Sequence, residues 1–157
     1  MKLNPFHIVL VEPEIPPNTG NIGRLCAATG THLHLVGKLG FSLDDKQVRR
    51  AGLDYWPEVI LHRWESLQEL QREYPGACFW YTSKKATRSY ADADFTAGDF
   101  LVFGKETLGL PEELLKQEGD HALRIPIFSP AVRSLNLANS AAILLYEALR
   151  QTGQLEE

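Results

Sequence analysis

The stretch Leu123–Gln151, LRIPIFSPAVRSLNLANSAAILLYEALRQ, contains the features that decide the fold. It begins as a short apolar strand, Leu123 to Ile127. It continues through a loop rich in Ser, Pro, Arg and Asn, Ser129 to Asn136, and becomes a long helix, Leu137 to Gln151. In α/β sheets, loops at the carboxyl ends of strands commonly hold ligands. The polar segment before the helix would offer backbone N–H groups and side-chain amides to such a ligand.

The predicted C-terminal helix has apolar residues on two sides. One stripe follows the spacing of a buried helix face and consists of Ala138, Ala141, Ala142, Leu145, Ala148 and Leu149. Ile143, Leu144 and Tyr146 form a second apolar surface. Such a helix is either deeply buried or covered by another subunit, and we expect contact with a second copy of the chain. Gly153 is expected to end the helix, and residues 153–157 are expected to fray.

Length and composition indicate one soluble domain over residues 1–157. The chain is 44% hydrophobic and 23% charged, which is ordinary for a globular protein. No apolar run is long enough to span a bilayer, and the run Phe6–Val11 is too short for a signal peptide. Cys26 and Cys78 show neither metal nor redox spacing, so two free thiols are expected. These features predict a cytoplasmic protein without membrane contact.

Strand-like and helix-like segments alternate along the whole chain. The predicted strands are Phe6–Val11, His32–Val36, Glu58–His62, Ala77–Thr82, Phe100–Gly104 and Leu123–Ile127. The predicted helices are Asn18–Thr29, a short one after Ser42–Asp45 ending near Arg50, one after the capping box Ser66–Glu69, Pro111–Gln117, and Leu137–Gln151. Asn18 or Asn21 is expected to cap the first helix and Gly30 to end it. The alternation predicts an α/β fold with a parallel sheet and helices on both faces.

Several common site types are absent from the sequence. The glycines do not form G-x-G-x-x-G or a P-loop, and no serine-hydrolase elbow occurs. His32 and His34 lie on one face of a strand, where packing or solvation is commoner than metal binding, so no metal is expected. The net charge of −4 and the pI of about 5.7 argue against a surface wholly devoted to nucleic acid. A local basic patch remains compatible with these values.

Three polar loops follow predicted strands. They are Asn18–Arg24, Phe103–Pro111 and Ile125–Asn139. Each loop by itself reads equally well as helix caps and turns, with Arg24 as a solvated helix residue and Glu106 as a turn carboxylate. Because all three follow strands, together they favour a functional role over simple helix caps and turns.

These loops resemble the three motifs of the SPOUT-class RNA 2′-O-methyltransferases. The matching patterns are N-x-G-N-I-x-R-L from Asn18, F-G-x-E-x-x-G-L-P from Phe103 and I-P-x6-R-S-L-N-L-A-N from Ile125. The resemblance extends from Ile8 to Arg150. It is closest to the small YibK-like group of tRNA (cytidine/uridine-34) 2′-O-methyltransferases, to which Val11–Ile22 and Asp44–Tyr55 are also similar.

The resemblance implies more than periodicity does. It implies a C-terminal trefoil knot, a homodimer, and S-adenosylmethionine as methyl donor without a metal. It also implies methyl transfer to the ribose 2′-OH of cytidine or uridine 34 in a tRNA anticodon loop, whose single-stranded bases are accessible. The alternatives are a non-catalytic RNA-binding module with this fold, and a methyltransferase that acts on another RNA or on a base.

The resemblance assigns expected roles to individual residues. Those expected to bind the donor are Tyr81, Thr82, Gly104, Ile125, Ser134, Leu135 and Asn136. Those expected near the reacting ribose are Arg24, Asn18 and Glu106. Because arginine stays protonated, our hypothesis is that Arg24 grips a phosphate next to the target hydroxyl. Apart from the resemblance, the positions of positive charges lead us to expect RNA contacts from Lys46, Arg49, Arg50, Lys84, Lys85, Arg88 and Arg133, although any single lysine among them reads more readily as a solvated surface charge.

Overall fold

A seven-stranded parallel sheet forms the centre of the fold. The computed structural model describes residues 5–156 except 45, 53 and 54, and gives no description of the side chains of residues 49, 51 and 52. The strands are β1 His7–Val11, β2 His32–Val36, β3 Ile60–Trp64, β4 Phe79–Thr82, β5 Arg88–Ser89, β6 Phe100–Phe103 and β7 Ala122–Arg124. Their order across the sheet is β3-β2-β1-β6-β4-β7-β5, and every pairing is parallel.

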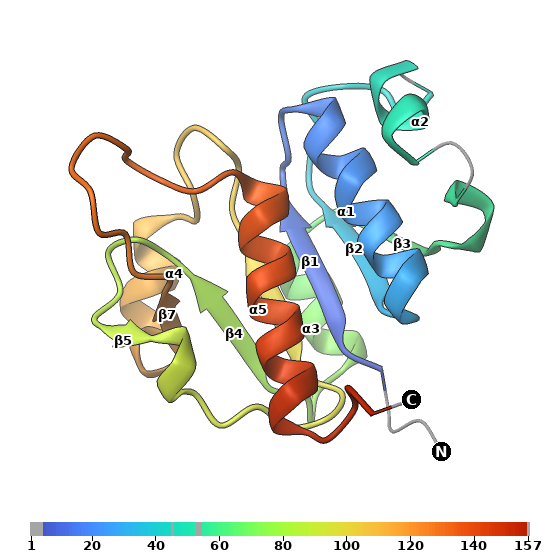
Figure 1. Cartoon of the computed structure of the whole chain (residues 1–157). Coiled ribbons are helices and arrows are strands. Elements are labelled where there is room, and N and C mark those ends of the chain that lie inside the picture. The colour runs from blue at the N-terminus through green and yellow to red at the C-terminus, as the bar shows by residue number, and fades with distance from the viewer. Residues whose placement is uncertain (1–4, 45, 53–54, 157) are drawn as a thin grey trace.

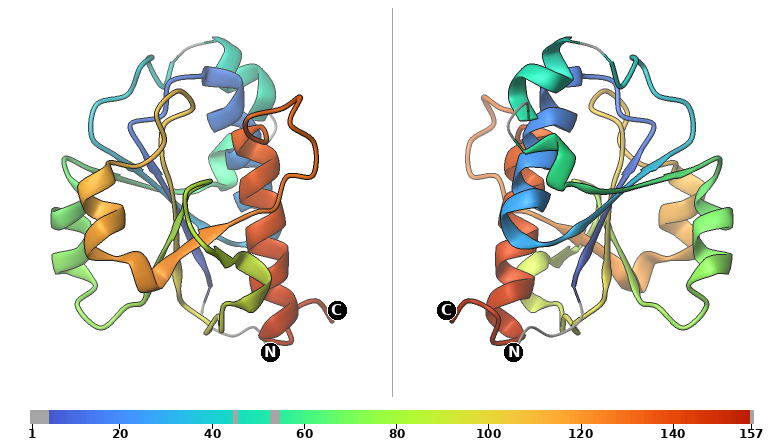
Figure 2. Two further views of the ribbon diagram at one scale, coloured as in Figure 1. Left: turned by 90° about the vertical axis from the view of Figure 1, so that its left-hand side faces the viewer. Right: turned by 90° about the vertical axis from the view of Figure 1, so that its right-hand side faces the viewer.

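Helices cover both faces of this sheet. They are α1 Pro16–Thr29, α2 Lys46–Gly52, α3 Leu67–Glu73, α4 Glu112–Gln117 and α5 Leu137–Gln151. Helices α1 and α5 lie side by side on one face, and α3 and α4 lie on the other (Figures 1 and 2). The expected α/β fold is therefore confirmed. The threading of the C-terminal segment as a trefoil knot stays a prediction.

Strand alternation builds a separate apolar core on each face. In β1, Ile8 and Leu10 pack with residues of α1 and α5, whereas Val9 packs with residues of α3. All three side chains are fully buried. Burying a side chain of this size contributes roughly 1.5–3 kcal/mol relative to exposure. The two cores thus fix the central strand, and with it the loop that follows Val11.

Helix α5 has the predicted bounds but a wider buried face than the predicted stripe. Its buried residues are Ala141, Leu144, Leu145, Ala148 and Leu149. Leu144 therefore belongs to the core and not to a second surface, because the helix packs against both its neighbour α1 and the sheet. Tyr146 remains exposed, and Ile143 is half-buried.

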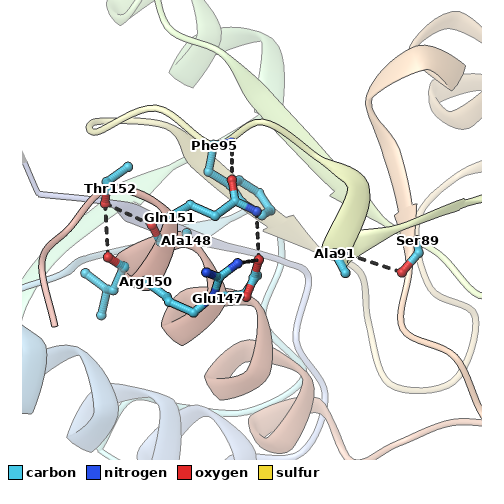
Figure 3. A network of polar contacts seen from close by, with 9 residues as sticks. Ser89, Ala91, Phe95, Glu147, Ala148, Arg150, Gln151 and Thr152 are labelled. Atoms are coloured by element: carbon cyan, nitrogen blue, oxygen red, sulfur yellow. Dashed lines mark hydrogen bonds and ion pairs between the residues drawn. The ribbon is translucent and has the colours of Figure 1, made fainter.

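The C-terminal end of α5 is fixed by polar contacts (Figure 3). Gly153 adopts a left-handed backbone conformation with a φ of 71°. The Gly153 amide donates to the Arg150 carbonyl, and the Gln154 amide donates to the Leu149 carbonyl. The Gln151 side chain accepts a hydrogen bond from the Phe95 amide at 2.9 Å and donates to Glu147 at 2.7 Å. The predicted stop at Gly153 is confirmed.

Proline shifts several boundaries from their predicted positions. Helix α1 begins at Pro16, because prolines at the first two positions need no N–H partner, and Ile15 rather than Asn18 or Asn21 occupies the cap. Strand β3 begins at Ile60 because Pro57 lies in a 3-10 turn, Trp56–Glu58. Strand β7 ends at Arg124, before Pro126, which has no N–H for a ladder.

The two predicted capping boxes have different outcomes. Ser66 caps α3 as predicted, since its hydroxyl accepts a hydrogen bond from the Glu69 amide at 3.1 Å. Ser42 instead accepts a hydrogen bond from the Asp44 amide, and α2 begins only at Lys46. Asp45 lies outside the described residues. In the part of the chain that the structure describes, no helix combines the length and apolar character needed to cross a membrane.

Candidate active site

A cavity of about 830 Å³ opens at the carboxyl ends of β1, β4 and β6. Four segments line it, one after each of β1, β4, β6 and β7. They are the start of the β1–α1 loop and of α1, residues 82–85, residues 103–112, and residues drawn from 123–140. Residues of all three predicted polar segments therefore line one cavity, but the first segment, Asn18–Arg24, lies within α1 and only its Asn18 reaches the cavity wall.

Glu106 ties two of these loops together. One carboxylate oxygen accepts the Glu14 amide at 2.8 Å, and the other accepts the Ile15 amide at 2.9 Å and the Asn18 side-chain amide at 3.1 Å. A carboxylate is well suited to the N-terminus of α1, where amides lack helical partners. Both oxygens of Glu106 thus accept hydrogen bonds, and these bonds hold the β1–α1 loop in place.

Asn18 and Asn136 connect the β1–α1 loop to the third loop. The Asn136 side-chain N–H donates to the Asn18 side-chain oxygen at 2.9 Å. The Asn136 oxygen accepts the Ala138 and Asn139 amides and so caps α5. One chain of hydrogen bonds, Glu106–Asn18–Asn136, therefore joins the three motifs at the cavity wall.

Glu14 and Thr107 provide a second connection between the first two loops. The Glu14 carboxylate accepts both the Thr107 amide at 3.0 Å and the Thr107 hydroxyl at 2.7 Å. These hydrogen bonds lower the pKa of Glu14, because they favour its charged form.

Gly104 lets two backbone segments of the cavity approach each other. A Cβ at this position would lie 2.1 Å from the Gly109 carbonyl carbon and 2.3 Å from the Leu110 nitrogen. Glycine is therefore required here by close backbone approach. The resulting turn is closed by a hydrogen bond from the Gly109 amide to the Lys105 carbonyl at 2.9 Å.

Most of the predicted donor-binding residues lie on the cavity wall. Those that line it are Thr82, Gly104, Ile125, Ser134, Leu135 and Asn136. Tyr81 does not line it, which corrects its expected place: its side chain is buried among the residues packed by α3 and accepts a hydrogen bond from Gln71 at 2.9 Å. The reason is strand alternation, which sends Tyr81 and Thr82 to opposite faces. Burial, followed by the nearby Glu118 charge, raises the pKa of Tyr81 to about 12.

Arg24 lies outside the cavity of its own chain. It is exposed on α1, about 9 Å further along the helix axis than Asn18. Its guanidinium carbon sits 4.9 Å from the centre of the Tyr55 ring, a cation–π contact. The fold therefore brings Asn18 and Glu106 together but leaves Arg24 apart from them.

The predicted RNA-contacting residues fall into two groups. Lys84 and Lys85 are at the cavity wall, and Lys85 pairs with Glu112 at 2.7 Å. Lys46, Arg50 and Arg133 are exposed elsewhere, and the Arg49 side chain is outside the described residues.

Arg88 differs from that expectation. Its guanidinium donates to the Asp92 and Asp120 carbonyls and lies over the Trp80 ring. These internal contacts occupy a side chain that was predicted to contact RNA.

A cluster of imidazoles lies away from the cavity, on the α3 face of the sheet. Ring nitrogens of His7, His32 and His34 come within 4.8 Å of one another, and His62 is 3.0 Å from His32. The Trp64 indole donates to Nδ1 of His34, so the proton of a neutral His34 is on Nε2, which faces Nδ1 of His7 at 2.9 Å. This nitrogen offers a proton and not a lone pair to a metal.

Several polar residues of the cavity wall had no individual role predicted from the sequence. Among them are Glu12, Lys105 and Thr107. Glu12 has an unusual φ of 51° and lies 3.5 Å from the Lys105 ammonium. The position of Glu12 directly after a buried strand was the one available signal, since such positions carry function in parallel sheets.

Comparisons with known proteins agree with this geometry. The model of the SpoU rRNA Methylase family matches residues 5–146. A tRNA (cytidine(34)-2′-O)-methyltransferase from Saccharophagus degradans is 51% identical over 152 residues, covering 94% of this chain and 96% of the relative. One with the same name from Methylovorus glucosotrophus is 52% identical over 147 residues, covering 93% and 95%.

Solved structures give the same result. A structure from work on the 2′-OH methylation of C/U34 on tRNA superposes with a TM-score of 0.89 at 44% identity, covering 94% of this chain and 96% of that one. The SpoU methyltransferase AviRb from Streptomyces viridochromogenes, in complex with AdoMet, has a TM-score of 0.82 at 28% identity, covering 96% of this chain and 62% of that one.

Proposed function

Because this chain belongs to the SpoU rRNA methylase family, we propose that it transfers a methyl group from S-adenosylmethionine to the ribose 2′-OH of cytidine or uridine 34 in tRNA. One observation carries the proposal, namely the Glu106–Asn18–Asn136 hydrogen-bond chain, which joins the three methyltransferase motifs at one cavity. Residues 1–157 would then form a single methyltransferase domain.

The cavity has features suited to the donor. Gly104 permits a narrow backbone turn that any Cβ would fill. Opposite this turn, residues 125–136 have no helix or strand, so their backbone N–H and C=O groups are not committed to a ladder. We assign Ile125 to the adenine, and Ser134, Leu135 and Asn136 to the methionine part, while Gly104 allows the backbone to approach the donor closely. When bound, S-adenosylmethionine supplies a methyl group activated by its sulfonium charge.

The residues of this chain chiefly provide alignment. Methyl transfer requires the hydroxyl oxygen, the methyl carbon and the sulfur to lie in line, and fixing such a geometry is a large part of catalysis. Asn18 and Asn136 lie at the cavity wall and hold each other's orientation. Glu106 already accepts three hydrogen bonds, so we assign it to positioning the β1–α1 loop.

The place of Arg24 supports the homodimer. Arg24 lies outside the cavity of its own chain. It can therefore hold a phosphate next to the reacting ribose only if a dimer places it beside the cavity of the second chain. The exposed Tyr146 and half-buried Ile143 on α5 give this second copy an apolar contact surface. Light scattering should give twice the chain mass of 17.6 kDa, and a monomeric mass with full activity would exclude this arrangement.

The proposed tRNA substrate implies a set of phosphate contacts and a cellular compartment. Lys84 and Lys85 at the cavity wall, with Lys46, Arg50 and Arg133, offer positive charge for the anticodon-loop phosphates. We place the protein in the cytoplasm, where these tRNAs are found.

Methyl transfer from labelled S-adenosylmethionine to total tRNA, taken from a strain that lacks this protein, tests the function. We expect 2′-O-methylated cytidine or uridine at position 34 after nucleoside analysis. Label on a base, or on another RNA, would contradict the proposed substrate. Donor binding without any transfer would favour a non-catalytic RNA-binding module.

A further inference from the structure

Glu12 combines a strained backbone with a place on the cavity wall. Among the described residues it is the only non-glycine with positive φ, at 51°. This left-handed conformation is unfavourable for a residue with a Cβ, because the Cβ comes too close to the following carbonyl oxygen. Such strain persists where the surrounding structure holds it, and it is commonest at functional sites.

The neighbours of Glu12 hold this conformation and make room for its side chain. The Glu12 amide donates to the Val36 carbonyl at 2.8 Å, which fixes the backbone at the end of β1. Its Cγ lies only 2.8 Å from where a Cβ on Gly37 would be. Gly37 therefore provides the space that the Glu12 side chain occupies.

The other cavity carboxylates are already engaged. Glu106 accepts three hydrogen bonds, and Glu112 accepts the Lys85 ammonium at 2.7 Å. The side chain of Glu12 is 43% exposed, accepts no hydrogen bond within the described part of the chain, and faces only the Lys105 ammonium, at 3.5 Å. Of these three carboxylates, Glu12 thus has the longest ion pair and accepts no hydrogen bond from the described residues, so it is the one best placed to accept a proton.

We propose that Glu12 is the general base of the methyl transfer, an assignment that rests on the proposed function. The ribose 2′-oxygen attacks the methyl carbon, and a C–O bond forms while the C–S bond breaks. The bonding electron pair goes to sulfur, which becomes a neutral thioether. The 2′-hydroxyl proton passes to the Glu12 carboxylate, so no further reactant is needed. Lys105 holds the carboxylate at the cavity wall.

Glu12→Gln tests this step with little change in shape. We expect the single-turnover rate on tRNA to fall roughly 10²- to 10⁴-fold, the range typical of a lost general base. Dissociation constants for donor and tRNA should stay within about threefold, because the lost interaction acts in the transition state. The matched control is Glu113→Gln, an exposed carboxylate on α4 that does not line the cavity, which should keep its rate within about threefold.

Rescue by a small carboxylate separates a base from a structural residue. Glu12→Gly suits the positive φ and leaves space beside Gly37. Added formate should raise its rate in proportion to concentration, whereas formate should not raise the rate of the wild-type protein. Absence of rescue in a folded, donor-binding Glu12→Gly protein would overturn the assignment.

The two proposals fail in different ways. An active wild-type protein with an equally active Glu12→Gln variant would overturn only the role of Glu12. A wild-type protein that transfers no methyl group to tRNA would overturn the proposed function, and the assignment of Glu12 with it.

Discussion

Thr19 carries a buried hydroxyl without a partner. Its side chain is fully buried on α1, and Oγ1 makes no hydrogen bond within the described residues. Thr19→Val keeps the branched shape and removes this unpaired group, so we expect the free energy of unfolding to rise by about 1 kcal/mol. Urea denaturation measures the change.

Thr31 provides the control for this prediction. It is also buried, but its hydroxyl is 2.7 Å from the Thr29 hydroxyl, with which it shares a hydrogen bond. Thr31→Val should lower the free energy of unfolding by about 1 kcal/mol. Equal effects from the two substitutions would contradict the reasoning.

Gly104 is the residue on which the shape of the cavity depends most directly. Gly104→Ala places a Cβ 2.1 Å from backbone, which cannot move without opening the 104–110 turn. We expect at least about a tenfold loss of donor affinity, which corresponds to about 1.4 kcal/mol. Titration calorimetry with S-adenosylmethionine measures the change.

Gly76 is the matched glycine, because a Cβ there meets nothing within 4 Å. Gly76→Ala should leave donor affinity unchanged and alter the free energy of unfolding by no more than about 0.5 kcal/mol. Unchanged donor affinity in Gly104→Ala would show that this turn does not shape the binding site.

Strands β1, β2 and β3 together create a cluster of neutral histidines. Burial, with smaller contributions from neighbouring imidazoles, lowers the pKa of His7 to about 4 and that of His34 to about 2. The pKa values of His32 and His62 are lowered for the same reason. The groups packed around them, Trp64, Tyr74 and Phe100, bring no carboxylate to favour the charged form.

This cluster predicts a protein that loses stability in mild acid. Below pH 6.5 the unfolded chain takes up protons at its histidines, whereas folded His7 stays neutral until about pH 4. Because the unfolded state then binds more protons, the free energy of unfolding falls as pH falls, by up to about 1.4 kcal/mol per pH unit for each such histidine. Urea denaturation between pH 7.5 and 5 measures this slope.

His7→Phe tests the origin of the slope. The ring of His7 stacks on Phe100 at 4.0 Å, so phenylalanine keeps the packing and removes the titration. The slope below pH 6.5 should decrease by up to about 1.4 kcal/mol per pH unit. An identical slope in wild type and variant would assign the acid sensitivity to other groups.

At the scale of the whole molecule, an acidic chain has to bind an anionic substrate. The net charge of −4 means that attraction for tRNA must come from the local distribution of lysine and arginine. We expect tRNA affinity to fall steeply as salt rises, since each phosphate contact releases counterions. Lys84→Ala should reduce the magnitude of this log–log slope by about one. Fluorescence anisotropy at several salt concentrations measures it.

Lys116 on α4 is the control for Lys84. It is exposed but does not line the cavity. Lys116→Ala should leave the salt dependence unchanged, whereas equal effects from the two substitutions would indicate attraction by overall charge and not by the cavity wall.

The sequence by itself determined the local elements and the identity of the site. Strand and helix periodicity, the Ser66 cap and the Gly153 stop depend on residues within a few positions of each other, so α5 could be predicted to the residue. Three motifs were enough to predict the family, the donor and the reaction. The prolines at 16, 57 and 126 shifted element boundaries by a few residues, because a residue without an N–H starts a helix early or ends a strand where hydrophobic periodicity alone does not show it.

Only the tertiary structure decided how the motifs act together. The Asn18–Glu106 and Asn18–Asn136 bonds join residues 88 and 118 positions apart, and they exist because the strand order places β1 beside β6 and brings the loops to one edge. The same order gathers the histidines of three strands, while the face that each strand residue occupies turns Tyr81 away from the cavity. Glu12, directly after β1, lines the cavity. Such contacts depend on strand order and on the face that each residue occupies, which neither composition nor periodicity determines.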